Sequence, residues 1–255
     1  MAALRRGTAP QATPPATSSS PLVKLARVCG TLWHDVLEFA LPQRCPGCGA
    51  PAENARVLCE RCWARLPALT TPVCARCLFD ERTPDGCTRH PHDRVHAAWI
   101  YDERVAALVQ AFKFGSRPAL APVLAPAMAA ALARAPRPTV VTGVPLHAAR
   151  RRERGYDQAA CLAAALAREL GVPYAEGVLV RARATVAQSG LGPEARRRNL
   201  RAAFRLAEPR WVAGHDVLVV DDVLTTGATL LEAMATVRSA GPGTRTRAAV
   251  VGWAS

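Results

Sequence analysis

The chain has 255 residues, 50% of them hydrophobic and 21% charged, so it can form a sizeable core and is not globally disordered. Its formal net charge is +13, from 33 basic and 20 acidic residues, and such a chain attracts polyanions such as nucleic acid, nucleotides and sugar phosphates. No apolar run reaches the roughly 18 residues of a membrane span, and the N-terminus lacks the apolar stretch of a secretory signal. We therefore expect a cytoplasmic protein with no membrane span.

The N-terminal part has two segments of different character. Residues 1–21 are rich in proline, threonine and serine, which is typical of a disordered tail. Over residues 22–43, apolar side chains recur at roughly helical spacing until Pro42, which predicts a helix. The polar side of this helix is not basic, so packing against the core or between domains is favoured over binding to a membrane surface.

Residues 44–96 form a cysteine-rich module that holds seven of the nine cysteines. Without an export signal, closely paired cysteines favour metal ligation over disulfides. Two CxxC pairs, ten residues apart, can place four thiolates around one tetrahedral Zn²⁺. The expected ligands are Cys45, Cys48, Cys59 and Cys62.

A third CxxC pair, followed by a cysteine and a histidine, predicts a second zinc site of the Cys3His type. Its expected ligands are Cys74, Cys77, Cys87 and His90, with His92 or His96 as alternatives for the histidine. The competing interpretation is a ribbon that has lost its metal and packs its thiols. Because residues 45–98 hold seven arginines and six acidic residues, we expect this module to support or dock rather than to read DNA.

The remaining residues, 98–254, alternate apolar strands with helical patterns. Helices are expected over 103–114, 119–135, 156–170 and 227–240, and strands over 139–144, 216–220 and 247–253. This alternation predicts an α/β domain with a mainly parallel sheet covered by helices on both faces.

The strand over 216–220 runs into Asp221 and Asp222, and a loop rich in threonine and glycine then opens a helix. Ligands of open α/β sheets bind at the carboxyl ends of strands, and a helix N-terminus offers free N–H groups to a phosphate. Two carboxylates beside a phosphate suit the hydroxyls of a ribose, since a carboxylate only accepts hydrogen bonds. The segment predicts a ribose 5-phosphate pocket; the alternative is an ordinary loop whose Asp and Thr residues cap the helix.

This segment resembles the phosphoribosyl pyrophosphate motif of type I phosphoribosyltransferases. Further segments, between about Leu41 and Trp253, are similar to the ComF (competence protein F) family: Lys113-Phe114, Val144-Pro145-Leu146, Arg154-Gly155-Tyr156-Asp157-Gln158, Gln188, Arg198-Asn199 and Ala203-Phe204. The resemblance implies a double zinc ribbon over residues 44–96, joined to a type I phosphoribosyltransferase-like domain over residues 98–254.

The resemblance also implies that the pocket binds Mg²⁺–phosphoribosyl pyrophosphate. Asp221 and Asp222 would be the catalytic carboxylates that hold the ribose hydroxyls. The other implied contacts are Thr225, Thr226, Gly227, Ala228 and Thr229 for the 5′-phosphate, Pro145, Leu146 and His147 for the pyrophosphate, and Lys113, Arg154, Gln188 and Arg198 as lid or phosphate candidates. Asp157 stands where the family has asparagine; it lacks donors, so we do not expect it to contact a phosphate.

Residues 145–205 hold twelve arginines and five acidic residues, the largest local charge bias of the chain. Such cations suit a departing pyrophosphate, and the glycine-rich segment 187–193 could close over a substrate. The alternative for Arg196, Arg197 and Arg198 is a solvated helix face.

Two functions fit these residues. The first is an enzyme that transfers a ribosyl group from phosphoribosyl pyrophosphate to a nitrogen nucleophile. The second, implied by the ComF resemblance, is a non-catalytic component of DNA uptake that senses a nucleotide or binds single-stranded DNA beside a competence helicase. With 5% aromatic residues, any DNA contact would be mainly electrostatic. A third function, that of a zinc-ribbon transcription factor, is disfavoured. As for the oligomeric state, related folds often dimerise, so a homodimer is an alternative to a monomer.

Overall fold

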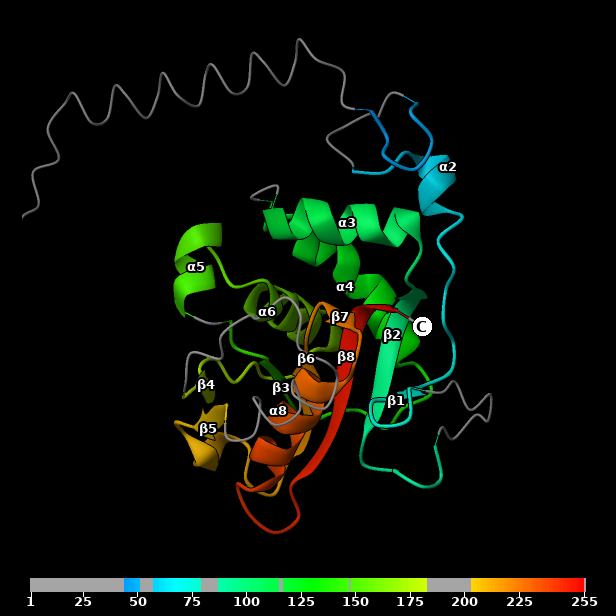
Figure 1. The fold of residues 1–255 in the computed structure, drawn as a ribbon. Coiled ribbons are helices and arrows are strands. Elements are labelled where there is room, and N and C mark those ends of the chain that lie inside the picture. The colour runs from blue at the N-terminus through cyan, green and yellow to red at the C-terminus, as the bar shows by residue number, and fades with distance from the viewer. Residues whose placement is uncertain are drawn as a thin grey trace, which may run out of the picture. The chain divides into compact units, whose positions relative to one another are not determined.

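The computed structural model describes residues 44–50, 57–78, 87–114, 117–146, 148–182 and 203–254. All of them belong to one compact unit of the chain (Figure 1). The tail expected over 1–21 and the helix expected over 22–43 lie outside the described residues. Across the described segments, no helix combines the length and apolar character that crossing a membrane requires.

The central sheet has six strands in the order β1-β2-β8-β6-β3, with β7 also paired to β8. Its strands are β1 (Val73–Cys74), β2 (Arg94–Ile100), β3 (Val140–Gly143), β6 (Asp216–Val220), β7 (Val223–Leu224) and β8 (Arg245–Trp253). Only β1 pairs antiparallel, so the sheet is mainly parallel, as the alternation of strands and helices predicts. A separate antiparallel pair joins β4 (Leu179–Arg181) to β5 (Phe204–Leu206).

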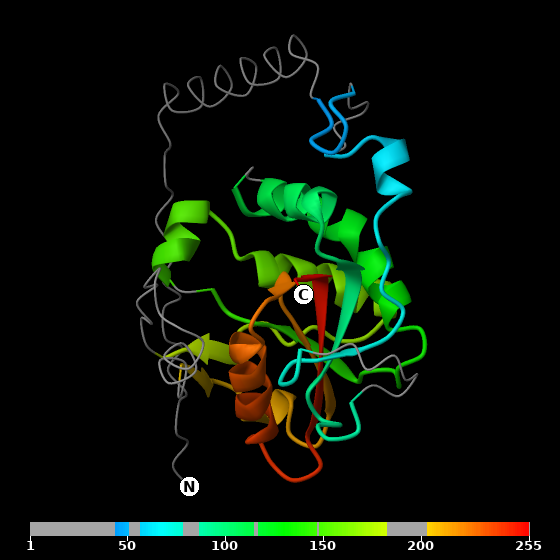
Figure 2. The same cartoon turned by 45° about the vertical axis from the view of Figure 1, so that its right-hand side comes forward.

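Helices cover both faces of this sheet (Figure 2). The helical elements are α2 (Glu60–Trp63), α3 (Glu103–Phe114), α4 (Leu120–Ala131), α5 (Ala148–Arg154), α6 (Gln158–Leu170), the 3-10 turn η1 (Pro209–Trp211) and α8 (Ala228–Arg238). Alternate residues of one strand point to opposite faces. Accordingly, Leu218 and Val220 of β6 pack with α3, α4 and α6, whereas Val217 and Val219 pack with α8.

Several elements differ from the sequence-based expectations. The helix expected over 119–135 ends at Ala131, and the strand expected over 247–253 already begins at Arg245. Strand β2 crosses the boundary that we expected at residues 96–98, and β1, which includes Cys74, joins the same sheet. The polar side chains of Arg94 and His96 conceal β2 in the sequence, because a buried strand is usually a continuous apolar run.

Candidate functional site

A cavity of about 300 Å³ opens at the carboxyl ends of β3 and β6. It brings together eight of the predicted site residues: Asp221, Asp222, Thr225, Thr229, Pro145, Leu146, Lys113 and Arg154. Thr226, Gly227 and Ala228 lead into α8 without lining the cavity. His147, Gln188 and Arg198 lie outside the described residues. Four further polar residues of the lining are Arg150, Asp157, Gln158 and Arg181.

The two carboxylates at the end of β6 are held by different partners. The Nζ of Lys113 lies 3.1 Å from Oδ2 of Asp222, and Oδ1 of Asp221 accepts a hydrogen bond of 2.8 Å from the backbone N–H of Asp222. Burial, and then the neighbouring Asp222 carboxylate, raise the pKa of Asp221 to about 8. At neutral pH this pair of carboxylates therefore retains a proton, and hydroxyl donors or a cation beside it would favour the release of that proton.

The raised pKa predicts a stability penalty that can be measured. Because folded Asp221 keeps a proton that the unfolded chain releases, stability should fall as pH rises from about 4 to about 8. We expect Asp221→Asn to raise the melting temperature at pH 7, by about 2–4 °C for each kcal/mol relieved. Calorimetric scans between pH 5 and pH 9, without added divalent cation, would measure the difference.

Asp216, at the other end of β6, provides the matched control for this prediction. The hydrogen bond from Arg245 lowers the pKa of Asp216, so its charged form stabilises the fold at neutral pH. Asp216→Asn should therefore lower the melting temperature at pH 7, the opposite sign. A lower melting temperature for Asp221→Asn at that pH would contradict the account of the acidic pair.

Asp157 connects the loop after β3 to the start of α6. Its Oδ1 accepts from the backbone N–H of Ala160 at 3.1 Å, which caps the helix, and its Oδ2 accepts from the N–H of Leu146 at 2.9 Å. An asparagine has one acceptor oxygen and an NH2 group that only donates, so it could not accept these two bonds on two separate atoms as the carboxylate does. The carboxylate thus fixes the backbone of one cavity wall.

Three arginines supply positive charge to the cavity. Arg154 of α5 lies over the ring of Phe114, 4.9 Å from its centroid, and donates to Oε1 of Gln158 at 3.2 Å. Arg181 of β4 lies 5.5 Å from the ring centroid of Phe204, and burial lowers its pKa. The third is Arg150 of α5. From the sequence, Arg154 is indicated through the ComF resemblance, whereas Arg150 and Arg181 are indicated only as members of the arginine-rich stretch 145–205.

Position 227 requires glycine for a structural reason that the sequence does not reveal. We expected it to let the backbone approach a phosphate, but a Cβ at this position would lie 1.9 Å from the carbonyl oxygen of Ala75. Gly227 also has a left-handed φ of 71°. Ala75 lies in the third CxxC knuckle, between Cys74 and Cys77. The start of α8 is therefore in direct backbone contact with the cysteine-rich segment.

The same segment also holds the C-terminal end of α8. Buried Asp93 lies 2.9 Å from Nε of Arg76 and 3.5 Å from an η nitrogen of Arg238, the last residue of α8. The other η nitrogen of Arg238 donates to the carbonyl of His92 at 3.2 Å. The helix that follows the threonine loop is thus tied to the cysteine-rich segment at both ends.

Both predicted ligand sets are assembled, with all ligand atoms of each set within 4.8 Å of one another. The Sγ atoms of Cys48 and Cys59 are 3.6 Å apart, and Sγ of Cys77 lies 3.2 Å from Nδ1 of His90. A tetrahedral zinc with bonds of 2.3 Å places two sulfurs about 3.8 Å apart, so both sets fit zinc. His90 completes the second set, whereas Nδ1 of His96 lies 3.2 Å from the Ala131 carbonyl.

Comparison with known proteins shows which domains and which family this chain resembles. Residues 36–88 match the double zinc ribbon domain, and residues 157–252 match the phosphoribosyl transferase domain. DNA utilization protein YhgH of Salmonella typhi is 31% identical over 194 residues, 74% of either chain. Competence protein F of Haemophilus influenzae is 32% identical over 212 residues, which cover 80% of this chain and 88% of the relative. The chain belongs to the competence protein F (ComF) family.

This ComF-family protein combines an N-terminal double zinc ribbon with an α/β domain of the phosphoribosyltransferase type. Among solved structures, a glutamine phosphoribosylpyrophosphate amidotransferase from B. subtilis is similar over 56% of this chain and 30% of that chain, with 22% identity and a TM-score of 0.36. The two domain matches and the order of the sheet are the basis of the fold assignment.

Proposed function

We propose that this ComF-family protein binds Mg²⁺–phosphoribosyl pyrophosphate in the 300 Å³ cavity and transfers its phosphoribosyl group to a nitrogen nucleophile. The observation that carries the proposal is the composition of this one cavity. The acidic pair and the threonine loop come from β6 and the start of α8, and the arginines come from α5 and β4. A substrate with ribose hydroxyls and two separate phosphate groups matches this distribution of charge.

Each group of residues has a task in this proposal. Asp221 and Asp222 accept hydrogen bonds from the ribose hydroxyls, and Lys113 positions Asp222. Thr225 and the N–H groups at the start of α8 hold the 5′-phosphate. The cluster of Arg150, Arg154 and Arg181 faces the pyrophosphate. When Mg²⁺ is bound with the substrate, it neutralises pyrophosphate charge and makes that group a better leaving group.

The transfer itself needs one bond broken and one formed at the anomeric carbon. The bond from this carbon to pyrophosphate oxygen breaks, and its electron pair leaves with the pyrophosphate. The lone pair of the nitrogen nucleophile forms the new bond, and the nitrogen then loses a proton to water. The arginine cluster stabilises the charge that develops on the leaving group.

The names of the relatives suggest the process in which this chemistry takes place. Because relatives are named DNA utilization protein and Competence protein F, we infer a task linked to DNA uptake, with single-stranded DNA and a helicase as candidate partners. One observation favours a second function, a non-catalytic sensor of phosphoribosyl pyrophosphate. Among the described residues that line the cavity there is no histidine, and both oxygens of Asp157 are occupied by backbone bonds.

Isothermal titration with phosphoribosyl pyrophosphate and Mg²⁺ tests the pocket. Asp221→Asn/Asp222→Asn should weaken binding by about 100-fold or more, since two hydrogen-bonded carboxylates are lost. The control, Glu169→Gln/Glu208→Gln, removes the same charge from exposed positions that line neither this cavity nor the other large one, and should leave the affinity unchanged. Failure of the folded native protein to bind would overturn the proposal. Release of pyrophosphate that depends on an added nitrogen acceptor would then distinguish the transferase from the sensor.

A further inference from the structure

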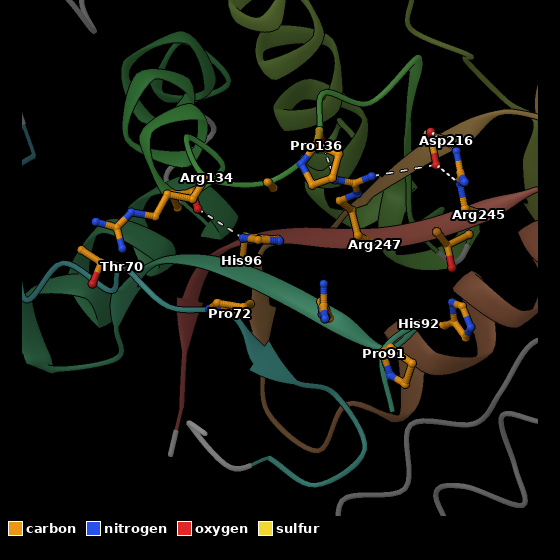
Figure 3. Close-up of a pocket in the computed structure, with 14 residues that line it drawn as sticks. Thr70, Pro72, Pro91, His92, His96, Arg134, Pro136, Asp216, Arg245 and Arg247 are labelled. Atoms are coloured by element: carbon orange, nitrogen blue, oxygen red, sulfur yellow. Dashed lines mark hydrogen bonds and ion pairs between the residues drawn. The ribbon is translucent and has the colours of Figure 1, made fainter. Parts of the chain in front are cut away.

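A second and larger cavity, of about 530 Å³, lies at the opposite end of the central sheet (Figure 3). It opens at the amino ends of β2, β6 and β8 and beside the end of α4. Its Asp216 begins β6 and lies five positions before Asp221, roughly 16 Å at about 3.3 Å per residue. Ligand sites of parallel sheets lie at the carboxyl ends of strands, so the fold does not account for this cavity.

The lining of this cavity has a large excess of positive charge. Four arginines line it, Arg94, Arg134, Arg245 and Arg247, against the single carboxylate of Asp216. That carboxylate is already engaged, because Arg245 donates to both of its oxygens at 2.6 and 2.8 Å. Arg247 lies 3.9 Å from the same carboxylate and also donates to the carbonyl of Pro136.

The remaining two arginines have no acidic partner in the described part of the chain. The Nε of Arg94 is buried and has no hydrogen-bond partner, and Arg134 forms no ion pair with a described residue. Arg247 is 14% exposed, so its charge is shielded from bulk water. Burial, and then the neighbouring Arg94 and Arg247, hold the pKa of His96 at about 4, so this buried imidazole is neutral at physiological pH.

Arg94 and Arg247 are partly buried, whereas Arg134 and Arg245 are exposed. Holding two like charges away from water, one with an unpaired donor, costs stability unless an anion completes the arrangement. We propose that this cavity binds a compact polyphosphate, either free pyrophosphate or the phosphate chain of a nucleoside diphosphate, with Arg94 and Arg247 as the inner contacts and Arg134 at the rim. The volume is within the range of small-molecule sites. No Phe, Tyr or Trp lines the cavity, and its two histidine rings are a small stacking surface, so it suits a compact phosphate group better than the stacked bases of a DNA strand.

The test uses the full-length, zinc-loaded protein and three probes: inorganic pyrophosphate, ADP and a thymidine oligonucleotide. Titrations are made in an Arg150→Gln/Arg154→Gln background, which removes two cations of the first cavity. In that background, adding Arg94→Gln/Arg247→Gln should weaken pyrophosphate binding by about tenfold or more. The control pair Arg61→Gln/Arg210→Gln removes the same charge from exposed positions outside both cavities and should change nothing.

The probes identify the source of the phosphate. Tighter binding of ADP than of pyrophosphate supports a nucleotide ligand, and equal or weaker binding supports recognition of the phosphate chain alone. Unchanged affinity in Arg94→Gln/Arg247→Gln overturns the proposal, as does binding of the oligonucleotide with neither small probe. If the double variant does not fold, Arg134→Gln at the exposed rim replaces it, and a measurable loss of pyrophosphate affinity is again required.

Discussion

Gly227→Ala should destabilise the protein by several kcal/mol, about 3–5 in the free energy of unfolding. The new Cβ would lie 1.9 Å from the carbonyl oxygen and 2.9 Å from the carbonyl carbon of Ala75. Both are backbone atoms, so neither can rotate away, and relief requires the zinc knuckle or α8 to move. Urea unfolding of native and variant protein measures the loss.

Gly214 provides a matched control for the backbone part of this effect. Its φ of 76° is almost the same as that of Gly227, but a Cβ there would meet nothing within 4 Å. Gly214→Ala should therefore cost only about 1 kcal/mol, the penalty of the left-handed conformation. Equal losses in the two variants would show that the contact between Ala75 and Gly227 has no energetic weight.

Removing zinc from the second cluster should disturb the first cavity, whereas removing it from the first cluster should not. Cys48→Ser and Cys77→Ser replace the second cysteine of two CxxC knuckles, and each should lower the zinc content from two ions per chain to one. In Cys77→Ser the knuckle around Ala75 loses its anchor and releases the start of α8. We expect affinity for phosphoribosyl pyrophosphate to fall by about tenfold or more, because Thr225 and the start of α8, the proposed 5′-phosphate contacts, are no longer held in place.

Hydrogen exchange makes this prediction independent of the proposed ligand. Amides at the start of α8, over 228–231, should exchange faster in Cys77→Ser and at the native rate in Cys48→Ser. Equal exchange in both variants would mean that zinc in the second cluster does not support the loop. Native protein that contains no zinc would contradict the assignment of both clusters.

The alternation of strands and helices could be predicted because each element carries its own signal. The apolar run of β6 and the Ala/Leu-rich pattern of α6 are examples, and both are found close to their expected bounds. Strand β2 carries a weaker signal, since Arg94 and His96 interrupt it and its burial depends on the neighbouring β8. Helix α5 is almost entirely alanine and arginine, and no periodic pattern reveals it.

The features of the candidate site also differ in how far the sequence could predict them. The acidic pair and the threonine loop are adjacent in sequence, so their chemistry could be predicted from one segment. The ion pair of Lys113 with Asp222 joins residues far apart in the chain, and only the resemblance to a family pointed to this lysine. The contact of Ala75 with Gly227 has no sequence signal, because it depends on where tertiary packing places two backbones.

The attachment of α8 to the cysteine-rich segment at both of its ends bears on how this architecture is inherited. At one end the backbone of Ala75 occupies the space beside Gly227, and at the other Asp93 pairs with Arg238. A recombination event that exchanged the ribbon for an unrelated domain would leave a buried glycine and an unpaired arginine without their partners. The two halves should therefore pass between genomes as one unit, and lineages that lose the ribbon should also show replacements at Gly227 and Arg238.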